Sequence, residues 1–247
     1  MVTSKELLSG TLSDARIGIG RGSDTGNIER SVHAFKSKNI TIYDDPGKLA
    51  EDLSSGKIDA AIRGDMSSSV LLPHIKRALN TQVLERVVLM EPADGKLFLL
   101  SPVGIDEGWT ISQRFALAVH SVELAKKIGL GTKIAVMSGG RCEDYGRCKA
   151  VNNSIDDALA LVKMLKDEGY DAYHSQILIE NAVKDADIVI APDGIYGNLL
   201  FRSMHLVGNV LAIGAPIVNS DKIFIDTSRA KMDYQDSISL ALKLTEK

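Results

Sequence analysis

The chain lacks the features that mark membrane, secreted and nucleic-acid-binding proteins. Its 247 residues contain no run of 18 apolar side chains, so no transmembrane helix is expected. The first ten residues are polar and of mixed charge, without the apolar core of a signal peptide, which predicts a cytoplasmic protein. The net charge of −3 implies no general attraction to nucleic acid or to an anionic membrane.

Cysteine and metal-ligating patterns are also sparse. The two cysteines, Cys142 and Cys148, do not match a zinc motif in spacing or surroundings. They could form a disulfide or join a metal site, but free thiols are favoured in a cytoplasmic protein. The five histidines form no HxxxH pair, so no metal site is predicted. A composition of 45% hydrophobic and 25% charged residues is that of a globular protein with one large or two small domains.

Segments typical of strands alternate with segments typical of helices along the chain. The apolar pattern predicts strands at residues 16–19, 40–43, 60–62, 133–137, 188–191 and 223–225, and helices at residues 28–36, 46–54, 69–79, 111–128, 153–168, 199–207 and 234–244. Two β-rich runs, residues 83–90 and 96–101, flank a Pro-Ala-Asp-Gly turn and predict a hairpin. Strands followed by helices of this length predict an α/β fold with a mostly parallel sheet.

The stretch of residues 188–198 places a candidate binding site. An apolar run is followed by a Pro-Asp-Gly turn and then by a Gly-Asn pair, which predicts a buried strand, a loop and a helix. Ligands of open α/β sheets bind where such strands end. Asp193, Gly197 and Asn198 are therefore candidate ligand contacts.

A glycine-rich segment, residues 17–27, offers a candidate anion site. Its glycines let backbone amides approach an anion, and the N-terminus of the following helix favours negative charge. Arg21 could add a bidentate clamp on phosphate or carboxylate. The pattern matches neither a P-loop nor a dinucleotide-binding fingerprint, and a flexible turn between strand and helix is the alternative.

Two further strand ends carry arginine. Arg63 and Asp65 follow a predicted strand and precede three serines, which offer hydroxyls and a helix cap. The alternative there is capping together with a surface ion pair. Ser138 and Arg141 lie in a glycine-rich loop after another predicted strand, where an arginine suits an anionic ligand. A solvated loop is the alternative.

The last candidate follows the strand predicted at residues 223–225. Ser228 could donate a hydrogen bond to a reacting carbonyl, and Arg229 could hold an anionic leaving group. Asp236 could act as a base where its neighbours set a suitable pKa. The alternative is that this segment supplies only turn and cap residues.

Several segments, taken in order, resemble the phosphotransacetylase and phosphate acyltransferase superfamily. They are residues 58–65 with the Leu72-Pro73 pair, 95–100, 122–138, 192–198, 214–216 and 226–229. The resemblance implies a two-domain isocitrate/isopropylmalate dehydrogenase-like α/β fold with mostly parallel sheets and an interdomain cleft. It implies a first domain of residues 1–84 plus 217–247 and a second of residues 85–216. It also implies that Ser228 polarises the reacting centre, Arg229 binds the anion and Asp236 acts as the base.

A closer resemblance, carried by residues 20–27 and 140–144, is to the methanogen family of methyltransferase subunit X, also called methanogenesis marker protein 4. It implies an archaeal, cytoplasmic and dimeric protein that has methyltransferase subunits as partners. An anionic phosphorylated or CoA-like ligand is then expected in the interdomain cleft, lined by Arg63, Arg141 and the Gly197-Asn198 pair. The sequence shows no cobalamin or S-adenosylmethionine motif.

Two other functions stay open. One is an active phosphate acyltransferase that moves an acyl group between phosphate and CoA. The other is a non-catalytic subunit of a methyltransferase complex, which is favoured because Leu72 stands where acyltransferases have an arginine before the proline. A decarboxylating dehydrogenase is disfavoured, since its metal-binding aspartates are missing at the matching places.

Overall fold

The computed structural model describes residues 3–9, 14–22, 26–35, 39–228 and 231–246. The chain divides into two compact units, which are described separately. Unit one comprises residues 1–4 and 85–212, and unit two comprises residues 5–84 and 213–247. Among the described residues, no helix combines the length and the apolar character needed to cross a membrane.

The sheet of unit two is mostly parallel. Its strands, in spatial order, are β2 (Ile40–Tyr43), β1 (Ile17–Gly20), β3 (Ala60–Ile62), β10 (Ile223–Asp226) and β9 (Leu211–Pro216). The first four run parallel, with Ile17 opposite both Ile40 and Ala60, and β9 pairs antiparallel with β10. β1 and β3 are buried along their whole length, which explains why each is a short apolar run without alternation.

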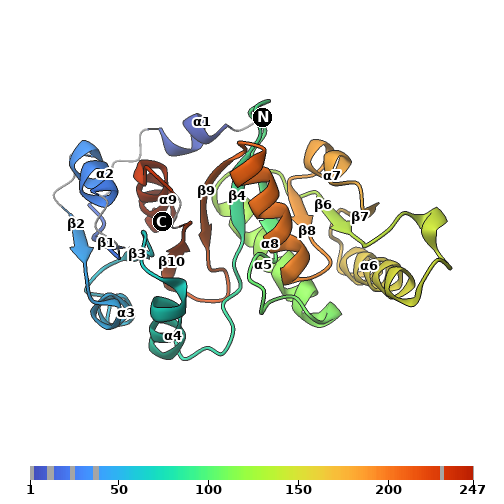
Figure 1. Ribbon diagram of the computed structural model, residues 1–247, viewed down its shortest axis with the longest axis horizontal. Helices are drawn as coiled ribbons and strands as arrows, with labels where there is room; N and C mark the ends of the chain where they lie inside the picture. Colours follow the sequence, from blue (N-terminus) through green and yellow to red (C-terminus); the bar gives the residue numbers. More distant parts are fainter. Residues whose placement is uncertain (1–2, 10–13, 23–25, 36–38, 229–230, 247) are drawn as a thin grey trace. The chain divides into compact units, whose positions relative to one another are not determined.

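Helices cover both faces of this sheet. Helices α2 (Asn27–Phe35) and α9 (Gln235–Thr245) contact each other on one face, and α3 (Pro46–Ser54) and α4 (Ser68–Ala78) contact each other on the opposite face (Figure 1). The short α1 (Ser4–Leu8) precedes them. Helix α3 begins where the sequence predicts it, because Pro46 fits the first turn and the Asp45 side chain accepts hydrogen bonds from two backbone N–H groups.

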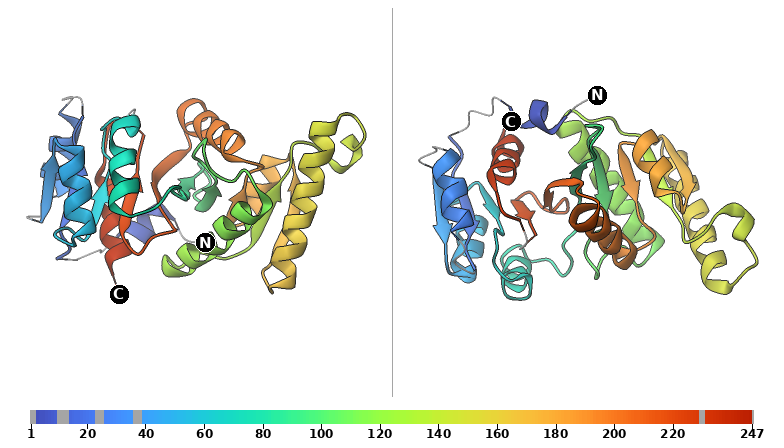
Figure 2. Two further views of the ribbon diagram at one scale, coloured as in Figure 1. Left: turned by 90° about the horizontal axis from the view of Figure 1, so that it is seen from below. Right: turned by 45° about the horizontal axis from the view of Figure 1, so that its top comes forward.

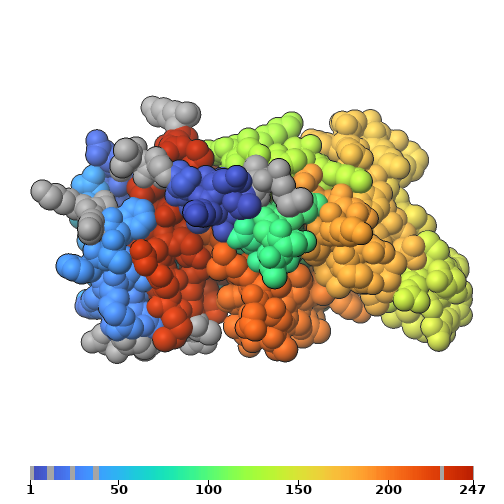
Figure 3. All heavy atoms as spheres, turned by 90° about the horizontal axis from the view of Figure 1, so that it is seen from above, coloured from blue at the N-terminus to red at the C-terminus, as the bar shows by residue number. Residues whose placement is uncertain are grey.

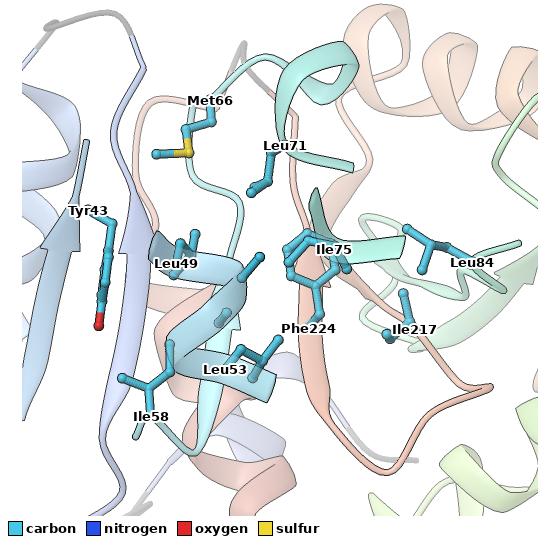
Figure 4. Packing of buried hydrophobic residues seen from close by; sticks show 12 residues of the cluster. Tyr43, Leu49, Leu53, Ile58, Met66, Leu71, Ile75, Leu84, Ile217 and Phe224 are labelled. Atoms are coloured by element: carbon cyan, nitrogen blue, oxygen red, sulfur yellow. The ribbon is translucent and has the colours of Figure 1, made fainter. Parts of the chain in front are cut away.

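The core of unit two lies between the sheet and helices α3 and α4. Leu49 and Leu53 of α3 and Leu71 and Ile75 of α4 are fully buried and pack with Phe224 of β10 (Figure 4). Burial of each such side chain stabilises the fold by about 1.5–3 kcal/mol relative to exposure. This packing holds β1, β2 and β3 in place. The candidate site described below lies beyond the carboxyl ends of these strands.

Unit one is a second α/β layer structure. Its strands lie in the order β4 (Val88–Glu91), β5 (Phe98–Ser101), β8 (Ile188–Ile190), β6 (Ile134–Met137) and β7 (Ala172–Gln176). β4 and β5 pair antiparallel, which confirms the predicted hairpin, and the other pairs are parallel. Helices α5 (Ile111–Lys127) and α6 (Lys149–Asp167) lie on one face, and α7 (Ile179–Asp185) and α8 (Gly194–Arg202) lie on the other (Figure 2).

Most predicted strands and helices are confirmed, with differences at their ends. The prediction missed α1, β7 and α7, which are short and mostly polar, and it also missed the apolar strand β9. Helix α8 begins at Gly194 rather than at residue 199, because Asp193 caps it. A π-helical turn, η2 (Ser203–Val207), follows it. Cys142 and Cys148 are exposed free thiols, as favoured from the sequence.

Candidate functional site

The ends of β1 and β3 in unit two form a topological switch point. The chain leaves β1 through α2 on one face of the sheet, and it leaves the neighbouring strand β3 through α4 on the opposite face. Because neighbouring strands send their connections to opposite faces, a crevice opens beyond their carboxyl ends, where open α/β sheets bind ligands. A pocket of about 390 Å³ lies there, lined by Arg21, Gly22, Asp44, Pro46, Asp65, Met66, Ser67 and Val70.

Arg21 lines this pocket, but carboxylates already hold its guanidinium. Nε and Nη2 donate to the two Asp44 carboxylate oxygens at 2.7 and 2.9 Å, and Nη1 pairs with Glu29. The hydrogen bonds from Arg21 hold the pKa of Asp44 and that of Glu29 below their usual values. The positive charge of Arg21 is therefore balanced within the protein.

The floor of the pocket depends on a close contact between the β1 and β3 loops. The backbone N–H of Gly22 donates to the buried Asp65 carboxylate at 2.7 Å. Gly64 has a φ of 61°. A Cβ on Gly64 would lie 1.9 Å from the carbonyl oxygen of Gly20. Only glycine fits at this position, and the two loops are held together.

The N-terminus of α4 opens on the same pocket. Ser67 is its N-cap residue, yet no side-chain capping hydrogen bond forms there. The Ser67 hydroxyl instead lies 2.8 Å from that of Ser69. The first N–H groups of a helix have no intrahelical partner, and the helix dipole places partial positive charge at this end. Hydroxyls and amides at the start of α4 are thus available to an anion.

Arg63 lies between β3 and β10 in a buried network. Its Nε pairs with Asp226, and its Nη1 donates to the carbonyl oxygen of Met66 at 2.7 Å. The neighbouring Thr227 hydroxyl donates to the carbonyl oxygen of Gly64 at 2.8 Å. Arg63 is only 6% exposed. The sequence predicts it as a ligand contact, and in the structure its guanidinium binds protein acceptors. Its role as a ligand contact stays a prediction.

The segment predicted to be catalytic is only partly described. Arg229 lies outside the described residues. The carbonyl oxygen of Ser228 accepts a 3.4 Å hydrogen bond from the hydroxyl of Tyr234. Asp236, in the first turn of α9, accepts a 2.7 Å hydrogen bond from the Lys231 ammonium. Burial raises the pKa of Asp236, and the Lys231 charge opposes that shift.

Sequence reasoning missed Tyr234 and Lys231 as neighbours of these residues. Tyr234 is fully buried, and burial together with the charge of Asp65 raises its pKa to about 12. Lys231 also donates to the carbonyl oxygen of Ile213 at 3.1 Å. The sequence gives only a weak indication that Lys231 pairs with Asp236. Lys231 precedes α9, so the two side chains are not related by the spacing of residues on one helix face.

The candidates after β8 in unit one have local structural roles. The Asp193 side chain caps α8 by accepting hydrogen bonds from the backbone N–H groups of Ile195 and Tyr196, at 2.8 and 2.9 Å. A Cβ on Gly197 would lie 1.7 Å from the carbonyl oxygen of Pro102. The Asn198 amide donates to the carbonyl oxygen of Val103 at 2.8 Å. The structure brings these three together, and the contacts of Gly197 and Asn198 hold α8 against the loop after β5.

Ser138 and Arg141 lie at the end of β6 in the same unit. The buried Ser138 hydroxyl donates to the carbonyl oxygen of Gly140 at 2.8 Å and lies 2.8 Å from Nε2 of His174. Arg141 is exposed, and its backbone N–H donates to the Asp144 carboxylate at 2.9 Å. Within the residues that the structure covers, no group of three or more His, Cys, Asp or Glu side chains is placed to hold a metal ion.

Sequence relatives are found among methanogens. The chain is 39% identical over 203 residues to "Putative methyltransferase mtx subunit X" of Methanosarcina barkeri, a match that covers 82% of this chain and 75% of that protein. It is 36% identical over 220 residues to an uncharacterized methyltransferase of Methanocaldococcus jannaschii, covering 85% and 89%. A phosphate acetyltransferase of Corynebacterium glutamicum is 24% identical, covering 81% and 68%. No protein-family model matches the chain.

Solved structures confirm the predicted fold class. A phosphotransacetylase from Streptococcus pyogenes has a TM-score of 0.71 and 16% identity, covering 99% of this chain and 98% of that one. A branched-chain phosphotransacylase from Enterococcus faecalis has a TM-score of 0.68 and 18% identity, covering 93% and 99%. An isocitrate dehydrogenase from Methylococcus capsulatus has a TM-score of 0.57 and 9% identity, covering 93% and 85%. At these identities the likeness concerns the fold alone.

Proposed function

The chain belongs to the methyltransferase mtx subunit X family, and we propose that its function there is to bind an anionic, phosphorylated or CoA-like ligand. The observation that carries the proposal is the pocket at the switch point of unit two, with the uncapped N-terminus of α4 on its wall. A volume of about 390 Å³ suits the phosphate-bearing part of a ligand.

The contacts to the anion come first from α4. Backbone N–H groups and the serine hydroxyls at residues 67–69 offer hydrogen-bond donors at the start of α4. The helix dipole adds a partial positive charge at the same end. A phosphate oxygen accepts from both kinds of donor without requiring a lysine. The fold's resemblance to phosphotransacetylases supports this ligand class.

Arg21 adds a second contact through exchange of partners. The Asp44 side chain is 68% exposed, and such exposed ion pairs contribute only about 0–1 kcal/mol. A phosphate in the pocket can therefore replace Asp44 on the Arg21 guanidinium at little cost, and it gains a bidentate contact there. Asp44 binds the edge of the Arg21 guanidinium that the phosphate would bind.

The test is a calorimetric titration with inorganic phosphate and, separately, with CoA. Asp44→Asn removes the competing carboxylate, so it should tighten phosphate binding by about tenfold, while Arg21→Gln should weaken it. Glu51→Gln serves as the matched control, because it removes an exposed carboxylate that does not line the pocket. Phosphate affinity unaffected by both Asp44→Asn and Arg21→Gln contradicts the proposal.

A second candidate is acyl transfer between phosphate and CoA, favoured by the sequence relative named phosphate acetyltransferase. Asp236 would accept the thiol proton of CoA, Ser228 would polarise the acyl carbonyl and Arg229 would hold the departing phosphate. The Lys231 contact keeps Asp236 oriented. Assays with acetyl phosphate and CoA test this directly, and an Asp236→Asn variant with full turnover would rule out Asp236 as the base.

A third candidate, a non-catalytic subunit of a methyltransferase complex, is favoured by the word "subunit" in the relatives' name. Native purification distinguishes it from the second. A chain that co-elutes with methyltransferase subunits, and that turns over no acetyl phosphate with CoA, supports the subunit role. A chain that elutes alone contradicts that role.

A further inference from the structure

A cysteine, a histidine and a serine from three neighbouring segments of unit one form a connected cluster. Cys142 lies in the turn η1 (Cys142–Asp144), His174 lies on β7 and Ser138 follows β6. The Cys142 Sγ is 3.9 Å from His174 Nδ1, and His174 Nε2 is 2.8 Å from the Ser138 hydroxyl. The chain between β6 and α6, yellow-green in Figure 3, lies on the surface of unit one, and Cys142 is exposed.

The hydrogen bonds determine which histidine nitrogen carries the proton. The single hydroxyl proton of Ser138 is donated to the carbonyl oxygen of Gly140. The Ser138 oxygen must then accept, so Nε2 of His174 is the N–H donor. The remaining nitrogen, Nδ1, keeps its lone pair and faces the thiol. Burial lowers the pKa of His174, which favours the neutral ring with an unprotonated Nδ1.

The end of β7 holds both sides of this cluster in place. The register between β6 and β7 shifts after the Val136–His174 pair, and Gln176 has a φ of 61°. That irregularity lets Gln176 bind both segments. Its backbone carbonyl accepts from Ser138 N–H, and its side-chain oxygen accepts from Cys142 N–H, each at 3.0 Å. Non-glycine residues rarely adopt this conformation, so the surrounding contacts must hold Gln176 in it.

We infer that Cys142 is a nucleophilic thiol, with His174 as its general base and Ser138 as the residue that positions the base. The substrate class is an alkyl or acyl carbon that bears a leaving group. Nδ1 of His174 takes the thiol proton, Sγ forms a bond to the carbon, and the leaving group departs with the bonding electron pair. The site lies in the other unit from the phosphate pocket, and it does not depend on the proposed function.

Cys148 provides an internal control in the same molecule. It is also an exposed free thiol, six residues along the chain. It occupies the N-cap position of α6, where its side chain makes no capping hydrogen bond. Iodoacetamide at neutral pH is the probe, and mass spectrometry measures the alkylation rate of each thiol. Helix N-termini activate thiols in general, so Cys148 serves as a reference for exposure and not as an unactivated thiol. The readout is the change in the ratio of the Cys142 rate to the Cys148 rate between the parent chain and variants of His174 and Ser138.

Two variants separate activation from exposure. His174→Gln keeps an N–H donor that can reach Ser138 but has no basic nitrogen, so the ratio of the Cys142 rate to the Cys148 rate should fall about tenfold. Ser138→Ala removes the acceptor for Nε2, and the ratio should fall part of the way. A general loosening of the fold raises both rates and leaves no such change in their ratio. A ratio that His174→Gln leaves unchanged contradicts the inference.

Discussion

The two units each contain a switch point at the carboxyl ends of their parallel strands, and the two are used differently. In unit one, the residues beyond β8 are engaged by the protein itself, since Asp193 caps α8 and Gly197 packs against a backbone carbonyl. In unit two, a pocket remains beyond β1 and β3, and the helix that starts there has no side-chain cap. Both arise from the same pattern, an apolar run followed by polar residues and glycine.

The difference shows that the pattern alone does not identify a binding site. What distinguishes the two is whether the polar groups at the strand ends already have partners within the unit. The Asp193 carboxylate accepts from backbone N–H groups at the start of α8. The Asn198 amide donates to a carbonyl oxygen of the loop after β5. The start of α4 lacks such a side-chain partner, which leaves donors for a ligand.

The largest expected effect tests the charge pairing beneath the pocket. Arg63→Met removes one member of the buried pair with Asp226, so urea denaturation should show a loss of about 4 kcal/mol. The double variant with Asp226→Leu should recover much of this loss, because both members of the pair are then apolar. A single variant as stable as the parent chain would show that the pair is not buried in solution.

A smaller effect is expected from crowding the contact between α8 and the loop after β5 in unit one. Gly197→Ala places a methyl group against the Pro102 carbonyl and should destabilise the chain by about 3 kcal/mol. Gly139→Ala is the matched control, since its Cβ would meet only side-chain atoms, those of Ser154 at 3.3 Å and Tyr196 at 3.8 Å. Equal unfolding midpoints for the two variants would mean that α8 does not pack closely there, and the contrast between the units would fail.

Acid should weaken unit two through Asp52. Burial acts to raise the pKa of Asp52, but hydrogen bonds from Lys57, Lys48 and Tyr43 outweigh it and lower the pKa to about 2. The stabilisation from the ionised group is complete above the unfolded pKa near 3.9 and is lost as the pH falls through about 2.

Asp52→Asn should therefore be about 2 kcal/mol less stable than the parent at neutral pH. The gap should narrow as the pH falls below about 4. Urea denaturation across that range measures both curves, and parallel curves would contradict the paired state of Asp52.

Much of the fold could be predicted from the sequence, because periodic apolar runs and cap residues are local signals. Asp45 before Pro46 and the Pro-Ala-Asp-Gly hairpin turn are examples that the structure confirms. β7 was missed because its mostly polar residues carry no apolar pattern and it pairs with β6 alone among the described strands. Site residues were harder to predict, since their partners are distant in the chain.

Two arginines show why the site could be predicted only in part. Arg21 was expected at an anion site, and it does line the pocket, but its pairing with Asp44 connects segments 23 residues apart and leaves no local signal. The partner of Arg63, Asp226, lies 163 residues away. The sequence shows which side chains end a strand, whereas only the fold shows which charges are already balanced.

The most direct measurement of the central claim is phosphate affinity in two variants of Ser67. Asp and Asn are both good N-cap residues, so Ser67→Asp and Ser67→Asn should each stabilise α4, by about 1 kcal/mol or less. Only the aspartate brings a negative charge to the pocket. Calorimetry should show phosphate binding retained in Ser67→Asn and weakened about tenfold or more in Ser67→Asp. Equal phosphate affinity in the two variants would contradict the claim that the start of α4 is the anion site.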